Sequence, residues 1–175
     1  MSPRRRSIPN DTIINLASQL LIERGPEAIT FAQVAQRSGL APATLVQRFA
    51  TRHALMESLS TGLTTLVAPA FEHPDTSPLE RLRAGSAQLA PAIGAAIALP
   101  SNAGTGQFSM ELRKQISFAL AAAIEAGELP RCDIAQLARV VQIAIVGAVA
   151  NARLEGSDVR AEVLQAVDAQ LAAYV

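Results

Sequence analysis

Apolar residues recur at helical spacing along almost the whole of this 175-residue chain, and this periodicity constrains its fold more than any other feature. From Ile13 onward, apolar residues follow at i+3, i+4, i+7 and i+8, as on one face of an α-helix. Near the C-terminus, apolar residues recur every fourth position at Val159, Val163, Val167 and Leu171. No segment alternates between apolar and polar residues for long enough to predict a strand. The sequence therefore predicts an all-α protein of eight or nine helices.

Capping residues, glycines and prolines divide this pattern into helices. Asn10 is the predicted N-cap of the first helix, and Gly25 followed by Pro26 ends it, because proline cannot continue the hydrogen-bond ladder. Pro91 is expected to break or bend a later helix. The predicted helices cover residues 10–24, 31–37, 42–49, about 51–69, about 79–99, about 108–126, 133–154 and about 158–174, and residues 100–106 are predicted to form a loop.

The net charge is zero over the whole chain but is unevenly distributed. Residues 1–60 hold seven arginines against four acidic residues, a net charge of +3. The remaining residues hold eight basic and eleven acidic ones, a net charge of −3. This asymmetry favours an anion-binding N-terminal part.

Other features of the composition exclude several kinds of protein. Cys132 is the only cysteine, so an intrachain disulfide is impossible and a structural zinc site is not expected. No apolar run follows the N-terminus, and the longest one, residues 143–150, is well short of the roughly 18 to 20 residues of a membrane span. We therefore expect a cytoplasmic protein that contacts no membrane. Because no phosphate-binding loop, nucleophile elbow or metal-ligand cluster occurs, we expect no enzyme activity and no cofactor.

The segment from Phe31 to Leu55 carries the most specific pattern in the chain. Thr30 and Gln33 have the spacing of a capping box at the start of a short helix. Gly39 ends that helix, and Pro42 suits the first turn of the next one. Two short helices joined in this way are typical of a helix-turn-helix, whose second helix enters the major groove of DNA.

Side-chain chemistry within this segment predicts individual DNA contacts. Gln47 and Arg48 lie on the polar side of the second helix, and glutamine pairs with adenine as arginine pairs with guanine, so we expect them to read bases. Thr30, Thr44 and Arg52 are better suited to phosphates. The predicted contacts also include Gln33 and Ala43 in the motif and, along the minor groove or the backbone, Arg4, Arg5 and Arg6. The alternatives are a solvated helix face and, for the arginine run, a solubilising tail.

Residues 30–56, from Thr30-Phe-Ala-Gln-Val-Ala to Arg-His-Ala-Leu-Met56, resemble the TetR family of transcriptional regulators. The resemblance covers about residues 10 to 60. It implies a three-helix DNA-binding helix-turn-helix module with a basic arm at residues 1–52 and a helical ligand-binding and dimerisation body at residues 53–175. Two positions differ: Val46 replaces a tyrosine that commonly contacts a phosphate, and Arg52 replaces a lysine.

The family resemblance implies a homodimeric repressor that a small molecule releases from a palindromic DNA operator. The penultimate helix is apolar nearly all round, so we expect part of it to face a second copy. The predicted interface residues are Leu137, Val141, Ile145, Ala148, Val163, Val167 and Leu171. One large core within a single chain is the alternative.

The ligand implied by the family would bind in the body, and the scarcity of aromatic and charged residues there favours an apolar one. The candidate pocket residues, for which ordinary core packing is the alternative, are Phe71, Leu89, Ile93, Phe108, Met110 and Phe118. A protein-interaction regulator that has lost specific operator binding is the rival function. Val46 and the uncapped Ala41 are the features that favour it.

Overall fold

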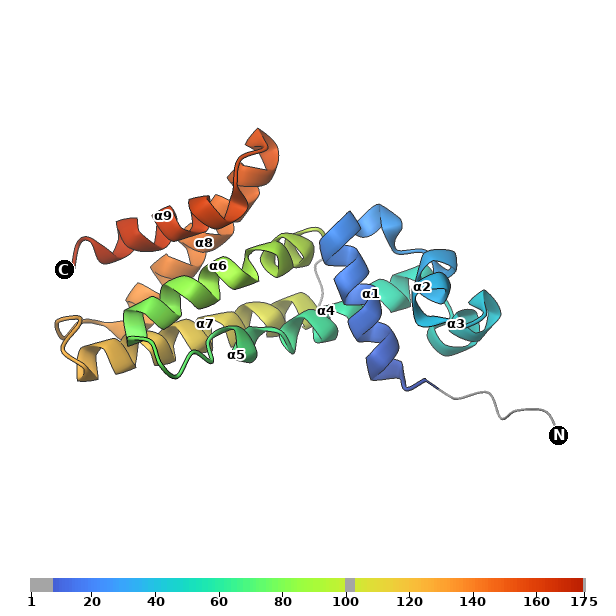
Figure 1. The fold of residues 1–175 in the computed structure, drawn as a ribbon, viewed down its shortest axis with the longest axis horizontal. Helices are drawn as coiled ribbons and strands as arrows, with labels where there is room; N and C mark the ends of the chain where they lie inside the picture. The colour runs from blue at the N-terminus through green and yellow to red at the C-terminus, as the bar shows by residue number, and fades with distance from the viewer. Residues whose placement is uncertain (1–7, 100–102, 175) are drawn as a thin grey trace.

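The computed structural model describes residues 8–99 and 103–174, and in these residues the chain forms helices and no strand, which confirms the all-α prediction. The molecule is elongated, with a head at one end and a body at the other (Figure 1). The head contains α1 (Asn10–Arg24), a 3-10 turn (Pro26–Ala28), α2 (Phe31–Ser38) and α3 (Pro42–Phe49). The connecting helix α4 (Arg52–Thr64) leads into a body made of α5 (Val67–Ala70), α6 (Pro78–Ile97), α7 (Ala103–Glu125), α8 (Ile134–Glu155) and α9 (Val159–Leu171).

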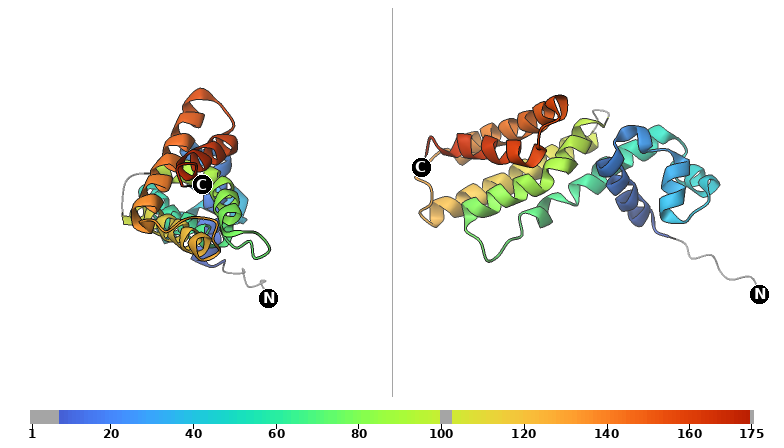
Figure 2. Two further views of the ribbon diagram at one scale, coloured as in Figure 1. Left: turned by 90° about the vertical axis from the view of Figure 1, so that its left-hand side faces the viewer. Right: turned by 45° about the horizontal axis from the view of Figure 1, so that its top comes forward.

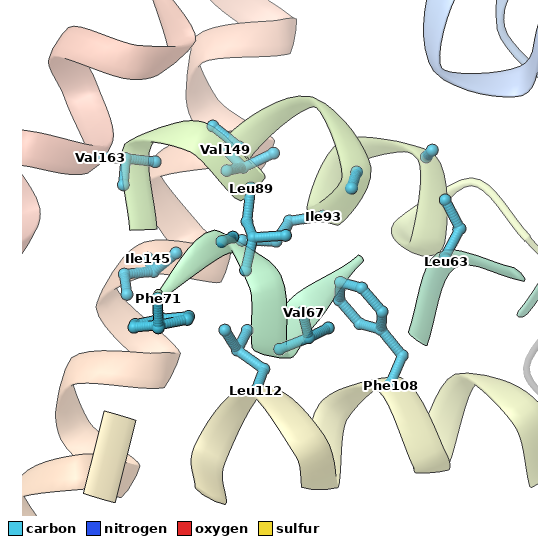
Figure 3. Close-up of a cluster of buried hydrophobic side chains, with 14 of the residues drawn as sticks. Leu63, Val67, Phe71, Leu89, Ile93, Phe108, Leu112, Ile145, Val149 and Val163 are labelled. Carbon is cyan, nitrogen blue, oxygen red and sulfur yellow. The ribbon is translucent and has the colours of Figure 1, made fainter. Parts of the chain in front are cut away.

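The long helix α6 lies at the centre of the body, where it contacts α7, α8 and α9 (Figure 2). α9 lies along α6 and α8 on one side, and α7 contacts α4 and α5 on the other. Side chains from all these layers meet in one apolar core, which includes Val67 of α5, Ile93 of α6 and Leu112 of α7 (Figure 3). The body therefore folds around its own core within a single chain.

Helix α4 joins the head to the body because it packs against both α1 and α7. It crosses α1 closely at Gly62, where a Cβ atom would come within 2.5 Å of the Ser18 hydroxyl. Leu55 and Leu59 of α4 are completely buried. The structure thus gives α4 a part in both units, and a division of the chain after residue 52 stays a prediction.

Most helix ends lie close to their predicted positions, and the differences have physical causes. Asn10 is the first residue of α1, and Pro9 occupies the cap position without a side-chain cap. Pro91 stays inside a continuous α6, although it cannot donate a backbone hydrogen bond. α7 begins at Ala103, five residues before the predicted Phe108, so the sequence-based loop ended too late. Glycines at 104 and 106 weaken a helix by only about 1 kcal/mol each, which tertiary packing readily offsets.

Helix α8 is long and apolar enough to cross a membrane by length and composition, which the unbroken apolar run alone did not indicate. Its most apolar window has a mean hydropathy of 1.5, and one third of that window is buried. One such helix is weak evidence for a membrane span, since core helices of soluble proteins can have the same length and composition. Its exposed side also carries Arg139 and Asn151, and an ionisable side chain that faces lipid is costly.

Candidate nucleic-acid interface

The turn between α2 and α3 has the geometry of a helix-turn-helix. The Thr30 hydroxyl accepts a hydrogen bond from the Gln33 amide at 3.2 Å, so the predicted cap at the start of α2 is present. Gly39 ends α2 in the left-handed conformation with φ of 71°, which a residue with a side chain adopts at a cost. Pro42 opens α3, and Leu45 and Phe49 anchor its inner side in the core of the head. α3 is therefore fixed on one side and open to solvent on the other.

The open side of α3 carries few hydrogen-bonding groups. Its exposed residues are Pro42, Ala43, Val46 and Gln47. Val46 is 46% exposed although it is apolar. Thr44 is half-buried beside them. The predicted reader Gln47 and the predicted contact Ala43 thus face outward. Val46, the noted departure from the family pattern, gives this side of α3 an apolar surface.

Arg48 lies away from this open side, contrary to its predicted place among the base readers. Its guanidinium donates hydrogen bonds to the Ile8 carbonyl and to the Asn10 side chain, the latter at 3.2 Å. Arg48 lies about 100° beyond Gln47 around the helix, outside the arc that the exposed residues occupy. Arg48 connects α3 to the start of α1, which makes it a positioning residue in this structure.

Arg52 also has partners inside the head. Its Nε donates to the Ile29 carbonyl at 2.7 Å and its Nη2 to the Pro26 carbonyl at 2.6 Å. These bonds tie the start of α4 to the 3-10 turn that follows α1. The predicted phosphate contact would have to use the remaining N–H groups of this side chain.

The other predicted DNA contacts fall at the edge of the motif or outside the described residues. Thr30 is half-buried and Gln33 is exposed, both at the N-terminus of α2. Arg4, Arg5 and Arg6 lie outside the described residues.

The head itself carries no excess charge. Residues 8–60 contain four arginines and four acidic residues, so the net charge of +3 found for residues 1–60 resides in the three arginines at positions 4–6. Arg37 of α2 forms two hydrogen bonds to the Glu23 carboxylate of α1, at 2.7 and 2.6 Å. The hydrogen bond from Arg37 lowers the pKa of Glu23 below its ordinary value. The excess positive charge of residues 1–60 thus lies entirely in the three arginines at positions 4–6.

The turn after α3 has an unusual backbone conformation. Ala50 has φ of 58° and ψ of −55°, and the Thr51 amide bonds back to the Phe49 carbonyl at 2.6 Å, which closes a γ-turn of the rare positive-φ kind. This conformation is strained for any residue with a Cβ atom. The strain lies directly between α3 and α4.

The structure contradicts the predicted dimer interface. All its members except the half-buried Ala148 are at most 2% exposed, because α8 and α9 pack against each other and against α6 within one chain (Figure 3). The opposite side of α8 is apolar and open, with Val140 40%, Ile143 61% and Leu154 86% exposed. Together with Gly147 these residues have the spacing i, i+3, i+7 and i+14, which marks a second apolar side of α8 in the sequence. We call these four residues the outer α8 face.

The predicted pocket residues are divided between the core and the surface. Phe71, Leu89, Ile93 and Phe108 are buried in the core of the body (Figure 3). Met110 and Phe118 are 74% and 59% exposed on α7. Phe118 lines a small hollow with Phe71, whereas Ile93 and Phe108 line a different cavity, so the assignment of all six residues to one pocket is wrong. In the described part of the chain, no three metal-ligating side chains cluster.

A cavity of about 230 Å³ lies between α6, α7 and α8, and Ile93 and Phe108 do line it. The buried Gln142 forms its polar edge: the Gln142 side chain accepts a hydrogen bond from Arg113 at 2.7 Å and donates one to the Ser109 carbonyl at 2.8 Å. Because the amide already has protein partners, the cavity offers mainly apolar contacts to a guest.

Comparison with known proteins agrees with this geometry. Residues 13–59 match the sequence profile described as bacterial regulatory proteins, tetR family. No curated protein matches the sequence significantly.

Solved structures match almost the whole chain. The regulatory protein TetR from Rhodobacter sphaeroides is similar over 97% of this chain and 100% of its own, with 19% identity and a TM-score of 0.73. SmeT, the repressor of the Stenotrophomonas maltophilia multidrug efflux pump SmeDEF, is similar over 97% of this chain and 91% of its own, with 18% identity and a TM-score of 0.66. PfmR from Thermus thermophilus is similar over 91% and 97%, with 22% identity and a TM-score of 0.58.

At these identities the solved structures show the fold of the chain, and the profile match shows that the head is similar in sequence to the tetR family. Residues 13–59 thus form a helix-turn-helix module similar to that of the tetR family, and a helical body with the fold of the solved regulators lies behind it.

Proposed function

We propose that this protein binds duplex DNA through the open side of α3 and represses transcription as a homodimer. The observation that carries the proposal is the geometry of α3, which is anchored by Leu45 and Phe49 and presents Gln47 outward beyond a capped and glycine-terminated α2. An α-helix held in this way fits the major groove. The named repressor SmeT, which has this fold, supports the direction of regulation.

A second copy of the chain is proposed to cover the outer α8 face. Exposed apolar side chains at Ile143 and Leu154 are costly in water, and a hollow of about 660 Å³ between α7 and α8 lies beside Ile143. Two copies related by a two-fold axis would present two α3 helices to a palindromic operator.

The oligomeric state tests this interface directly. Ile143→Glu places a charge on the outer α8 face and is expected to give folded monomers by sedimentation, because Ile143 is exposed in the single chain. Thr61→Glu adds the same charge at an exposed site on α4 and should leave the dimer intact. A dimeric Ile143→Glu protein would contradict the proposed interface. Ile145→Glu is unsuitable for this test, since Ile145 is fully buried and its substitution would unfold the chain.

The effector is proposed to be a small apolar molecule that occupies the cavity between α6, α7 and α8. The residues that line the cavity support an apolar ligand. Ile93, Phe108 and Leu112 contribute apolar side chains, and the polar group of Gln142 lies at one edge. SmeT has been solved in complex with triclosan, which is consistent with an apolar ligand in this fold. A ligand alters DNA binding only if it favours one conformation of the protein over another.

Anisotropy of a labelled random-sequence duplex at low salt tests DNA binding. The wild-type protein should bind, and its affinity should fall steeply with salt, as phosphate neutralisation requires. Gln47→Glu places a negative charge on the open side of α3 and should abolish binding. Gln88→Glu makes the same change at an exposed site on α6 and should not affect it. Equal effects of the two substitutions, or no binding by the wild type, would refute the proposal.

A further inference from the structure

We infer that α3 recognises its site mainly through the C5-methyl groups of thymines, contacted by Val46 and Ala43, with Gln47 as the hydrogen-bonding base reader of this helix. This inference rests on the proposed DNA binding and adds the kind of sequence that is bound. It concerns the one surface of α3 that the head leaves open.

The helical geometry brings the exposed residues of α3 together on one surface. Successive residues of an α-helix are about 100° apart, so the exposed positions 42, 43, 46 and 47 fall within an arc of about 140°. Val46 and Ala43 lie in the middle of this arc, and Gln47 lies at one edge. A helix that approaches DNA with its open side would bring the two apolar side chains to the base edges first.

The charged and hydroxyl side chains of α3 do not share this surface. Arg48 is about 100° beyond Gln47, and its guanidinium bonds to the Ile8 carbonyl and the Asn10 side chain. Thr44 lies between Arg48 and Gln47 around the helix and is half-buried. The arginine contact to guanine, which is the commonest specific contact in the major groove, is therefore missing from the open side of α3.

The chemistry of the major groove determines what this surface can read. The thymine methyl is the apolar group that base pairs present there, and it packs against alanine and valine side chains. A G·C pair opposite Val46 would instead place the cytosine amine or the guanine oxygen against a side chain that cannot hydrogen-bond to it. Gln47 can pair with adenine through N6 and N7. All three residues thus favour A·T pairs.

The length of the surface limits how many pairs it reads. Residues 42–47 extend about 7.5 Å along the helix axis, while base pairs are stacked about 3.4 Å apart. The surface therefore covers about two to three base pairs of each half-site. We expect these pairs to be A·T, with thymine methyls facing Val46 and Ala43.

Base analogues test the inference one group at a time. Duplexes that the wild-type protein selects from a random pool are remade with uracil in place of single thymines, which removes only the methyl group. Uracil at a contacted position should weaken binding about fourfold, the effect of exposing one methyl-sized group. In Val46→Ala, the penalty at one such position should disappear. The control variant Leu66→Ala, which shortens an exposed apolar side chain remote from α3, should keep it.

The adenine contact has its own analogue. Substitution of 7-deazaadenine removes the N7 acceptor and should weaken wild-type binding at one position. The Gln47→Ala protein should bind the adenine and the 7-deazaadenine duplexes equally, because it lacks the side chain that contacts N7.

The outcomes separate this inference from the proposed function. If the wild-type protein binds no duplex at low salt, the DNA-binding proposal itself fails. If it binds and the uracil substitutions have no effect, or the penalty persists in Val46→Ala, reading of methyl groups by Val46 is overturned. The inference would also be overturned if the wild-type protein selected sites with guanines and lost its preference for them when Arg48 is replaced. Arg48 would then be the base reader.

Discussion

Replacement of Arg4, Arg5 and Arg6 by glutamine should reduce the salt dependence of DNA binding. The described head has no net charge between residues 8 and 60, and three of its four arginines bond to groups of the head: Arg37 to Glu23, and Arg48 and Arg52 to backbone carbonyls. The arm therefore supplies the excess positive charge of the N-terminal part.

The magnitude follows from counterion release. Each neutralised phosphate contributes a slope of about −0.9 to a plot of log affinity against log salt concentration, so three lost contacts lower the slope by about 2.7 for each protomer bound. Between about 50 and 200 mM salt, the wild-type affinity should fall about 40-fold further than that of the variant, counted for one protomer.

Fluorescence anisotropy at four or five salt concentrations measures this slope. The same three residues changed to lysine keep the charge and should restore the wild-type slope. Circular dichroism checks that all three proteins are folded. An unchanged slope in the glutamine variant would show that the arm contacts no phosphate and that other cationic side chains neutralise the DNA.

Three further predictions concern the stability of the head. Ala50→Gly should raise the free energy of unfolding by about 1 kcal/mol in urea denaturation, because glycine adopts the positive φ of this turn without strain; a loss of stability would show that the turn is not strained. Arg52→Gln should lower it by about 1 to 3 kcal/mol, because two carbonyls lose a charged donor; no change would mean that water replaces the guanidinium. The lowered pKa of Glu23 stabilises the fold above the unfolded pKa, and this stability is lost as the pH falls through the folded pKa. Urea melts between about pH 7 and 3 should thus show a smaller loss for Glu23→Gln than for the wild type, and parallel curves would show that the bond to Arg37 adds no stability.

The helix-turn-helix could be predicted from the sequence because its signals are local. The Thr30 cap, the left-handed Gly39 and Pro42 at the start of α3 each depend on residues a few positions away, and the structure has all three. The composition of α8 is also a local signal. It predicted that this helix has more apolar residues than one buried side can hold.

What the sequence could not determine depends on contacts between distant residues. Both sides of α8 are apolar, and periodicity does not tell whether Ile145 or Ile143 faces the core of its own chain. Arg48 lies next to Gln47 in a polar stretch, but the carbonyl of Ile8, forty residues earlier, holds it. The start of α7 at Ala103, ahead of glycines at 104 and 106, is likewise not indicated by local preference.

Methyl NMR of the protein labelled at valine and leucine tests most directly which surface meets DNA. On addition of a duplex at low salt, the account predicts that the methyl resonances of Val46 shift, while those of Val140 and Leu154 on the outer α8 face do not. Shifts at Val140 and Leu154 with Val46 unchanged would contradict it, because the DNA would then contact the body and leave the open side of α3 free.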